Sequence, residues 1–221
     1  MLNNYFLSLK DSITFFNLFE YITFRSALAA ITALLLSFII GPLIIRKLKE
    51  NQIGEEIRDN GPITHLVKRG TPTMGGVIII FAALLPTLMF SHLDNTMIKI
   101  VIISTIWMGI IGFIDDYLKV IKKVEKGMVA RYKMIGQITL GILISYWIVN
   151  SNDFMNFNTK TTIPFLKNIE IDLGYIYPLL VIIVISATSN AVNLTDGLDG
   201  LAIGLLAICF SVFAAVSYIT G

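Results

Sequence analysis

The chain alternates between long apolar runs and short polar stretches, and the length of the apolar runs predicts membrane-spanning helices. A helix needs roughly 20 mostly apolar residues to cross the hydrocarbon core, because backbone groups there must hydrogen-bond within their own segment. Six stretches of the chain qualify or nearly qualify. They are residues 26–45, 75–93, 98–114, 134–149, 173 to about 191, and 201–218. We therefore expect an all-α, polytopic membrane protein with six transmembrane helices in a single transmembrane domain.

Ahead of the first run, apolar residues recur at helical spacing between charged ones. The apolar positions are Leu2, Phe6, Leu9, Ile13 and Phe16. One apolar face and one charged face, with Lys10 and Asp11, are typical of a helix that lies in the membrane interface. We predict such an N-terminal interfacial helix.

The composition agrees with a bilayer environment and excludes other classes. At 55% hydrophobic and 14% charged residues, the chain has more apolar surface than a soluble domain of this size can bury. The net charge is only +2, and no cluster interleaves basic and aromatic residues on a soluble face, so we expect no nucleic-acid binding. The single cysteine, Cys209, lies in an apolar run and rules out an intrachain disulfide.

The basic residues predict the orientation in the membrane. Twelve of the seventeen Lys and Arg residues fall in two loops, residues 46–69 and 119–133. Cytoplasmic loops retain Lys and Arg, so both loops should face the cytoplasm. The N-terminus should then lie outside, and the two acidic clusters described next should lie inside.

Two adjacent carboxylates, Asp115 and Asp116, end an uncharged run that covers residues 100–114. A carboxylate loses hydration beside hydrocarbon, so a retained pair faces water, a cation or a substrate path. Neighbouring helix residues point about 100° apart, so we expect different roles for the two. One can bind a divalent cation while the other contacts substrate or handles a proton, because like charges need a cation nearby.

A second polar cluster, spaced every three residues, separates the last two apolar runs. It consists of Asn190, Asn193, Asp196 and Asp199. Four such residues are costly at membrane depth without a ligand, so we favour a binding role. The Gly- and Pro-rich segment 68–76 adds Lys68 and Thr73, which offer donors to a phosphate or nucleobase. These residues predict a cytoplasmic, acidic, Mg²⁺-dependent site for a charged, phosphorylated substrate.

Four sequence blocks carry a family resemblance. They are GTPTMGG at residues 70–76, FIDDY at 113–117 followed by Lys119, ARYK at 130–133, and NAVNLTDGLDGL at 190–201. In content, order and spacing they closely resemble the bacterial phospho-N-acetylmuramoyl-pentapeptide-transferases. The resemblance implies transfer of phospho-N-acetylmuramoyl-pentapeptide from its UDP carrier to undecaprenyl phosphate, which gives lipid I of peptidoglycan synthesis and releases UMP. It also implies Mg²⁺ as cofactor and an active site on the cytoplasmic side of the bacterial inner membrane.

The resemblance implies a role for each matching residue. Asp115 matches the aspartate nearest the lipid phosphate or its proton, and Asp116 the one directed at the metal and diphosphate, although these roles are interchangeable. Asp116 and Asp199 are the implied metal ligands, and with Asp115 the implied catalytic residues. The implied substrate-binding residues are Lys68, Thr73, Lys119, Lys133, Asn190, Asn193 and Asp196. The lysines at 119 and 133 suit phosphate charge, and Lys68 and Thr73 suit the uridine and diphosphate pocket.

The resemblance also implies that the family fold continues beyond this sequence. Family members have about ten spans, and their later part carries a further metal-binding aspartate and a histidine-rich cytoplasmic loop. We therefore expect these residues to form the N-terminal portion of such a fold and to be inactive by themselves. The resemblance is compatible with a homodimer.

Two other functions stay open on the sequence. A transferase that uses UDP-N-acetylglucosamine and a polyprenyl phosphate would share the aspartate pairs, although the segment at 70–76 favours the muramoyl-peptide branch. A cation-coupled transporter would place carboxylates at helix breaks, but it would place them near the membrane midplane instead of on one face. Direct attack by the lipid phosphate and a covalent aspartyl intermediate are both compatible with these residues.

Overall fold

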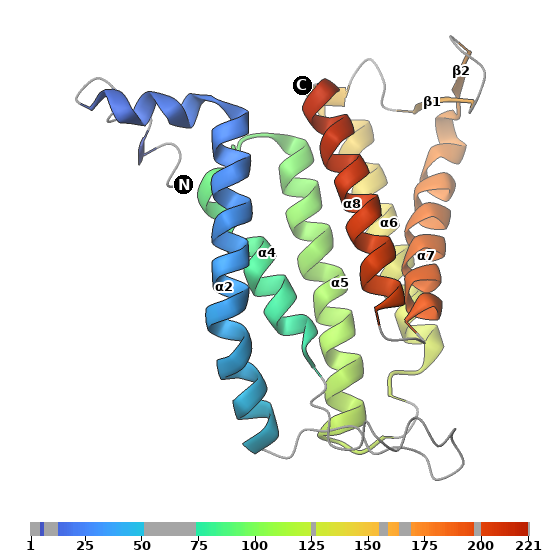
Figure 1. Ribbon diagram of the computed structural model, residues 1–221. Helices are drawn as coiled ribbons and strands as arrows, with labels where there is room; N and C mark the ends of the chain where they lie inside the picture. Colours follow the sequence, from blue (N-terminus) through green and yellow to red (C-terminus); the bar gives the residue numbers. More distant parts are fainter. Residues whose placement is uncertain are drawn as a thin grey trace. The chain divides into compact units, whose positions relative to one another are not determined.

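The helices of the computed structural model follow the apolar runs (Figure 1). The structure describes residues 5–6, 13–50, 74–124, 127–154, 159–163, 169–196 and 200–220. Six long helices are α2 (Ile22–Glu50), α4 (Gly76–Phe90), α5 (Thr96–Val120), α6 (Ala130–Asn150), α7 (Tyr177–Thr195) and α8 (Leu201–Thr220). Short 3-10 turns are η1 (Thr14–Glu20), η2 (Asn152–Phe154) and η3 (Gly174–Ile176), and a hairpin pairs β1 (Lys160–Thr162) with β2 (Glu170–Asp172).

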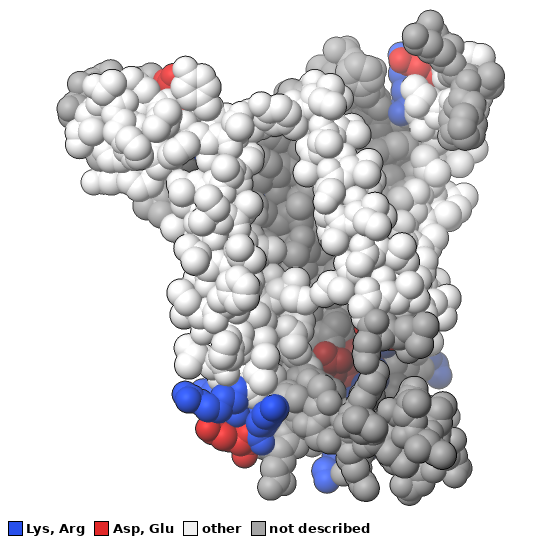
Figure 2. Space-filling model, in the orientation of Figure 1, with Lys and Arg blue, Asp and Glu red and all other residues white. Residues whose placement is uncertain are grey.

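The all-α, polytopic class is confirmed. Five of the described helices are long and apolar enough to cross a membrane, and α4 is an apolar helix of 15 residues. At about 1.5 Å per residue α4 is roughly 22 Å long, shorter than the hydrocarbon core. Figure 2 shows uncharged residues along the helices and the described charged residues near the helix ends.

The chain divides into two compact units, Met1–Gly136 and Gln137–Gly221, with the boundary inside α6. In the first unit α2 packs on α4, and α4 packs on α5. The start of α6 is joined to α5 by the Trp107 indole N–H, which donates to the Gly136 carbonyl at 3.0 Å. A Cβ on Gly136 would lie 2.5 Å from the Ile111 Cδ1 atom, so the glycine allows this close approach.

The N-terminal segment forms an aromatic cluster ahead of α2. Phe6 stacks on Phe16 with ring centroids 5.2 Å apart, and Phe19, only 4% exposed, contacts both Phe6 and Phe24. The described part of the predicted interfacial helix, Thr14–Glu20, is a 3-10 helix, and most of the remainder lies outside the described residues.

In the second unit, α6 and α7 approach each other closely at Gly141. A Cβ on Gly141 would lie 2.7 Å from Ile182 Cγ1 and 3.0 Å from its Cα, so only glycine allows the two backbones to approach this closely. Leu140 and Ser145 beside it are each 1% exposed. Small residues have this function in membrane helix pairs, where close van der Waals contact replaces a hydrophobic driving force.

The segment between α6 and α7 contains the antiparallel hairpin. Asp172 closes the hairpin, because its carboxylate accepts hydrogen bonds from the Thr159 hydroxyl and from the Gly174 backbone N–H. The hydrogen bond from the Thr159 hydroxyl, and to a lesser extent the one from the Gly174 N–H, hold the pKa of Asp172 below its ordinary value. The charged form therefore keeps the end of β2 joined to the turn that starts α7.

Candidate active site

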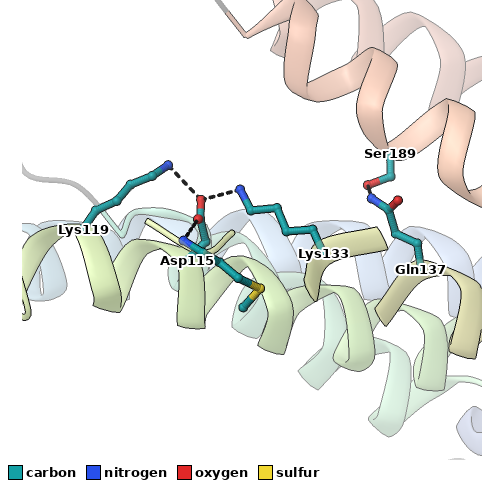
Figure 3. Close-up of polar contacts among 6 residues, drawn as sticks. Asp115, Lys119, Lys133, Gln137 and Ser189 are labelled. Atoms are coloured by element: carbon teal, nitrogen blue, oxygen red, sulfur yellow. Dashed lines mark hydrogen bonds and ion pairs between the residues drawn. The ribbon is translucent and has the colours of Figure 1, made fainter. Parts of the chain in front are cut away.

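Asp115 is a buried carboxylate at the centre of an ionic cluster near the end of α5 (Figure 3). Its side-chain Oδ2 lies 2.8 Å from Lys119 Nζ and 2.9 Å from Lys133 Nζ. Its Oδ1 accepts a hydrogen bond of 2.8 Å from the Met128 backbone N–H. Lys119 stands one turn further along α5, whereas Lys133 comes from α6, so the carboxylate joins two helices and the loop between them.

Gly127 makes this arrangement possible. Its φ of +59° lies in the left-handed region, which non-glycine residues rarely adopt. A Cβ at this position would lie 2.6 Å from Asp115 Oδ1 and 2.6 Å from Lys119 Cε. The loop can therefore fold over the carboxylate only because residue 127 has no side chain.

The cluster carries an excess positive charge. One carboxylate, 7% exposed as a residue, faces two ammonium groups. The lysine side chains are 45% and 31% exposed for Lys119 and Lys133, so solvent reaches them although it hardly reaches Asp115. Two partly accessible ammonium groups held on one oxygen are suited to an incoming phosphate, whose oxygens accept several charge-assisted hydrogen bonds.

The two adjacent aspartates have different surroundings, as their helix positions predict. Asp115 is buried among basic groups, while Asp116 is half-buried on the next face of α5. Both oxygens of Asp115 are already engaged by N–H donors, so they do not fit the role of cation ligands. Asp116 has a carboxylate, the type of ligand group that Mg²⁺ prefers. Within the part of the chain that the structure describes, no three His, Cys, Asp or Glu residues gather as a metal cluster.

In the second unit, the sequence reasoning missed Gln137. This residue is 3% exposed on α6, and its Nε2 donates to the Ser189 hydroxyl on α7 at 3.1 Å (Figure 3). Its Oε1 accepts a hydrogen bond of 3.3 Å from the Asn190 Nδ2, which also donates to the Ser186 carbonyl at 2.8 Å. Gln137 therefore orients the amide of a predicted substrate-binding residue. The signal in the sequence was an amide side chain inside an apolar run.

The remaining predicted residues fall into two groups. Asn193 is exposed on the last turns of α7, and Asp196 is the exposed residue that ends that helix. Lys68, Thr73 and Asp199 lie outside the described residues. The structure thus brings together Asp115, Lys119 and Lys133. Of the predicted acidic pair, Asp196 is among the described residues and Asp199 is not.

The comparisons with known proteins show which family the chain belongs to. Residues 98–221 match the family model described as glycosyl transferase family 4. This chain belongs to glycosyl transferase family 4. Residues 68–80 match phospho-N-acetylmuramoyl-pentapeptide-transferase signature 1, which includes the predicted donors Lys68 and Thr73. The family match includes the ionic cluster around Asp115.

Within glycosyl transferase family 4, the chain is similar to proteins named phospho-N-acetylmuramoyl-pentapeptide-transferase. It is 48% identical to the one from Desulforapulum autotrophicum over 100% of this chain and 62% of that protein. The identity is 47% for Thermodesulfovibrio yellowstonii, over 100% and 61%, and 44% for Chlorobium chlorochromatii, over 98% and 60%. The chain thus spans about three fifths of the length of these relatives. The resemblance predicted from the four sequence blocks is confirmed.

We expect Gly127→Ala to open the loop above Asp115. The left-handed conformation costs a non-glycine residue roughly 1–2 kcal/mol, and the new methyl group overlaps the carboxylate. The Met128 amide should then exchange its hydrogen about tenfold faster or more, because a hydrogen bond to a charged group contributes roughly 1.5–3 kcal/mol. Hydrogen–deuterium exchange measures this rate. Gly112→Ala is the control, since a Cβ there meets nothing within 4 Å. An unchanged Met128 rate in Gly127→Ala would contradict the expected role of the glycine.

We expect Gln137→Leu to weaken the pairing of α6 with α7. The change leaves the Ser189 hydroxyl and the Asn190 amide without their interhelical partner, at a cost of roughly 1–3 kcal/mol. Unfolding titrations of Gln137→Leu, Ser189→Ala and the double variant should show a coupling of about 0.6 kcal/mol, up to about 1.7. Ser145→Ala is the control, because that buried hydroxyl donates to the Gly141 carbonyl within α6. Strictly additive effects would show that the Gln137–Ser189 contact contributes nothing.

Proposed function

We propose that this chain supplies the lipid- and nucleotide-facing part of an enzyme that transfers phospho-N-acetylmuramoyl-pentapeptide from UDP-N-acetylmuramoyl-pentapeptide to undecaprenyl phosphate. The products are lipid I and UMP, and the cofactor is Mg²⁺. The observation that carries the proposal is the pair of lysine ammonium groups held on the Asp115 carboxylate. The signature at 68–80 and the names of the relatives support the choice of substrates.

The proposed reaction needs what this cluster offers. Phosphoryl transfer is catalysed mainly by positioning and by neutralising charge on the phosphate oxygens. The ammonium groups of Lys119 and Lys133 lie 2.8 and 2.9 Å from one Asp115 oxygen, and without that carboxylate they would repel each other. Asp115 thus positions two cations so that one phosphate can contact both, and on this proposal the phosphate is that of the lipid.

The position of Asp115 favours direct attack by the lipid phosphate. For the Asp115 carboxylate itself to attack phosphorus, it would have to leave two ammonium groups and one backbone N–H. A lipid phosphate held by the same lysines already presents an oxygen nucleophile. In this reaction an oxygen of the lipid phosphate forms a bond to the sugar-bearing phosphorus of the UDP carrier. The bond from that phosphorus to the bridging oxygen breaks, so that UMP leaves with the bridging oxygen.

The metal and the nucleotide complete the proposed site. Asp116 and Asp199 would hold Mg²⁺, which would neutralise charge on the diphosphate. Lys68 and Thr73 would contact the uridine and diphosphate, together with the polar residues of α7 and its end: Asn190, Asn193 and Asp196. The site would face the cytoplasm of a bacterial inner membrane, with the N-terminus outside, since twelve of the seventeen basic residues lie in the two loops on that side.

The transferase activity is testable with the chain joined to the C-terminal part of the Desulforapulum autotrophicum relative and placed in lipid nanodiscs. UMP release with both substrates should fall about 100-fold in Lys119→Gln and in Lys133→Gln, as when one charge-stabilising donor is removed from an active site. Lys122→Gln, which changes an exposed lysine of the same loop, should keep full activity. Because the two lysines act as a unit, the double variant should lose less than the product of the single losses.

The same assay separates the rival functions. Faster turnover of UDP-N-acetylglucosamine would favour the other sugar-phosphate transferase. Cation flux in vesicles without UMP release would favour a transporter. Equal activity losses in the Lys122 control and in the two cluster variants would remove the proposed role of the cluster.

We expect Asp116→Asn to abolish the response to Mg²⁺. In the joined chain, chelation should stop UMP release and added Mg²⁺ should restore it, whereas Asp116→Asn should stay inactive at every Mg²⁺ concentration. The carboxamide oxygen lacks the charge that retains a divalent cation. Asp153→Asn, a change on the far side of α6 from the cytoplasmic loops, is the matched control. Wild-type Mg²⁺ dependence in Asp116→Asn would assign the metal to other residues.

A further inference from the structure

The hairpin between α6 and α7 has one apolar and one charged face. Its register pairs Lys160 with Asp172, Thr161 with Ile171 and Thr162 with Glu170, and the Ile163 N–H continues the ladder to the Ile169 carbonyl. Side chains alternate between the faces of a strand. One face therefore carries Thr161, Ile163, Ile169 and Ile171, and the other carries Lys160, Thr162, Glu170 and Asp172.

The apolar face is not covered by a described element. Ile169 and Ile171 are 46% and 42% exposed, and among the described helices and strands the extensive contacts of β1 and β2 are with each other. The opposite face pairs Lys160 Nζ with Glu170 Oε2 at 3.4 Å. A two-stranded hairpin is marginally stable in water by itself, so this one needs a surface for its isoleucines.

The length of α7 places the hairpin at the membrane boundary. The apolar span from Gly174 to Thr195 has 22 residues. At about 1.5 Å per residue it is roughly 33 Å long, hardly more than the hydrocarbon core of about 30 Å. Gly174 must therefore lie close to one edge of that core.

The hairpin is tied to this edge by a very short connection. Only Leu173 separates Asp172 from Gly174, and two residues extend at most about 7 Å. The headgroup region on each side of the core is roughly 5–8 Å deep. The hairpin is thereby confined to the headgroup region or its immediate border.

Neighbouring side chains continue an interfacial surface. Tyr175 is fully exposed and Ile176 is 61% exposed in the turn that leads into α7. Tyr146 lies in the last turns of α6, just before the connection that contains the hairpin, and is 70% exposed. Tyrosines concentrate at headgroup level, where the ring is apolar and the hydroxyl is hydrated.

We propose that the Ile163–Ile169–Ile171 face of the hairpin lies on the bilayer, at the boundary between headgroups and acyl chains, with Lys160, Glu170 and Asp172 turned to water. The partner is the phospholipid leaflet in which α7 begins. Bound this way, the hairpin prevents α7 from sliding along its axis. It thereby sets the depth at which α7 holds Asn190 near its other end.

Neighbouring residues on opposite faces provide the test. In a Cys209→Ala background, Ile171→Cys and Glu170→Cys are each labelled with a nitroxide in the 221-residue chain, which is reconstituted in phosphatidylcholine–phosphatidylglycerol vesicles. Power-saturation electron paramagnetic resonance then compares collisions with O₂, which concentrates in hydrocarbon, and with a water-soluble nickel chelate. We expect the O₂-to-nickel ratio to be several-fold higher at position 171 than at position 170.

Two results would overturn the proposal. Equal ratios at the two positions would place both faces in water. Protection of position 171 from both reagents would show that protein covers the isoleucine face. Ile169→Cys and Thr162→Cys repeat the comparison with a second pair of positions on the same two faces. If one substitution disturbs the hairpin, the other pair still gives the comparison.

Discussion

Hydrocarbon offers no hydrogen bonds, and this constraint decides how the polar residues of the chain are used. Asp115 and Gln137 are both buried on apolar helices, and each contacts polar groups from another element. A polar group without such partners costs several kcal/mol in a low-dielectric surrounding, so each one ties two elements together in a single register. Asp115 joins α5, α6 and the loop between them, and Gln137 joins α6 to α7.

The contacts that satisfy Asp115 also create the chemistry of the candidate site. Satisfying one buried carboxylate takes two lysines and a backbone N–H, and this concentrates two cations beside an apolar helix. Gly127 contributes through the side chain that it lacks, since any Cβ there would displace the carboxylate. Packing and electrostatics are therefore inseparable at this position, and a change made for one alters the other.

The ends of the spans follow a different rule, because water, headgroups and hydrocarbon meet there. The aromatic cluster around Phe19 precedes α2, and the hairpin with its isoleucine face precedes α7. Both consist of short elements that carry little stability of their own. Their amphipathic side-chain patterns suit a boundary between two solvents, and on the proposal made above the hairpin anchors α7 at one end.

The sequence by itself determined the number and type of the long elements, since the thickness of hydrocarbon demands an apolar run of a certain length and every run became a helix. It was less informative about the ends. The first predicted span stops at residue 45, yet α2 continues to Glu50, because charged residues leave the membrane without leaving the helix and Arg46 pairs with Glu50 one turn on. The sequence blocks also marked Asp115, Lys119 and Lys133 as candidates. Only the tertiary structure decided that both lysines meet Asp115, and that Gln137 meets residues 52 and 53 positions away. Those contacts depend on helix rotation and on one left-handed glycine, which no local pattern of apolar and polar residues encodes.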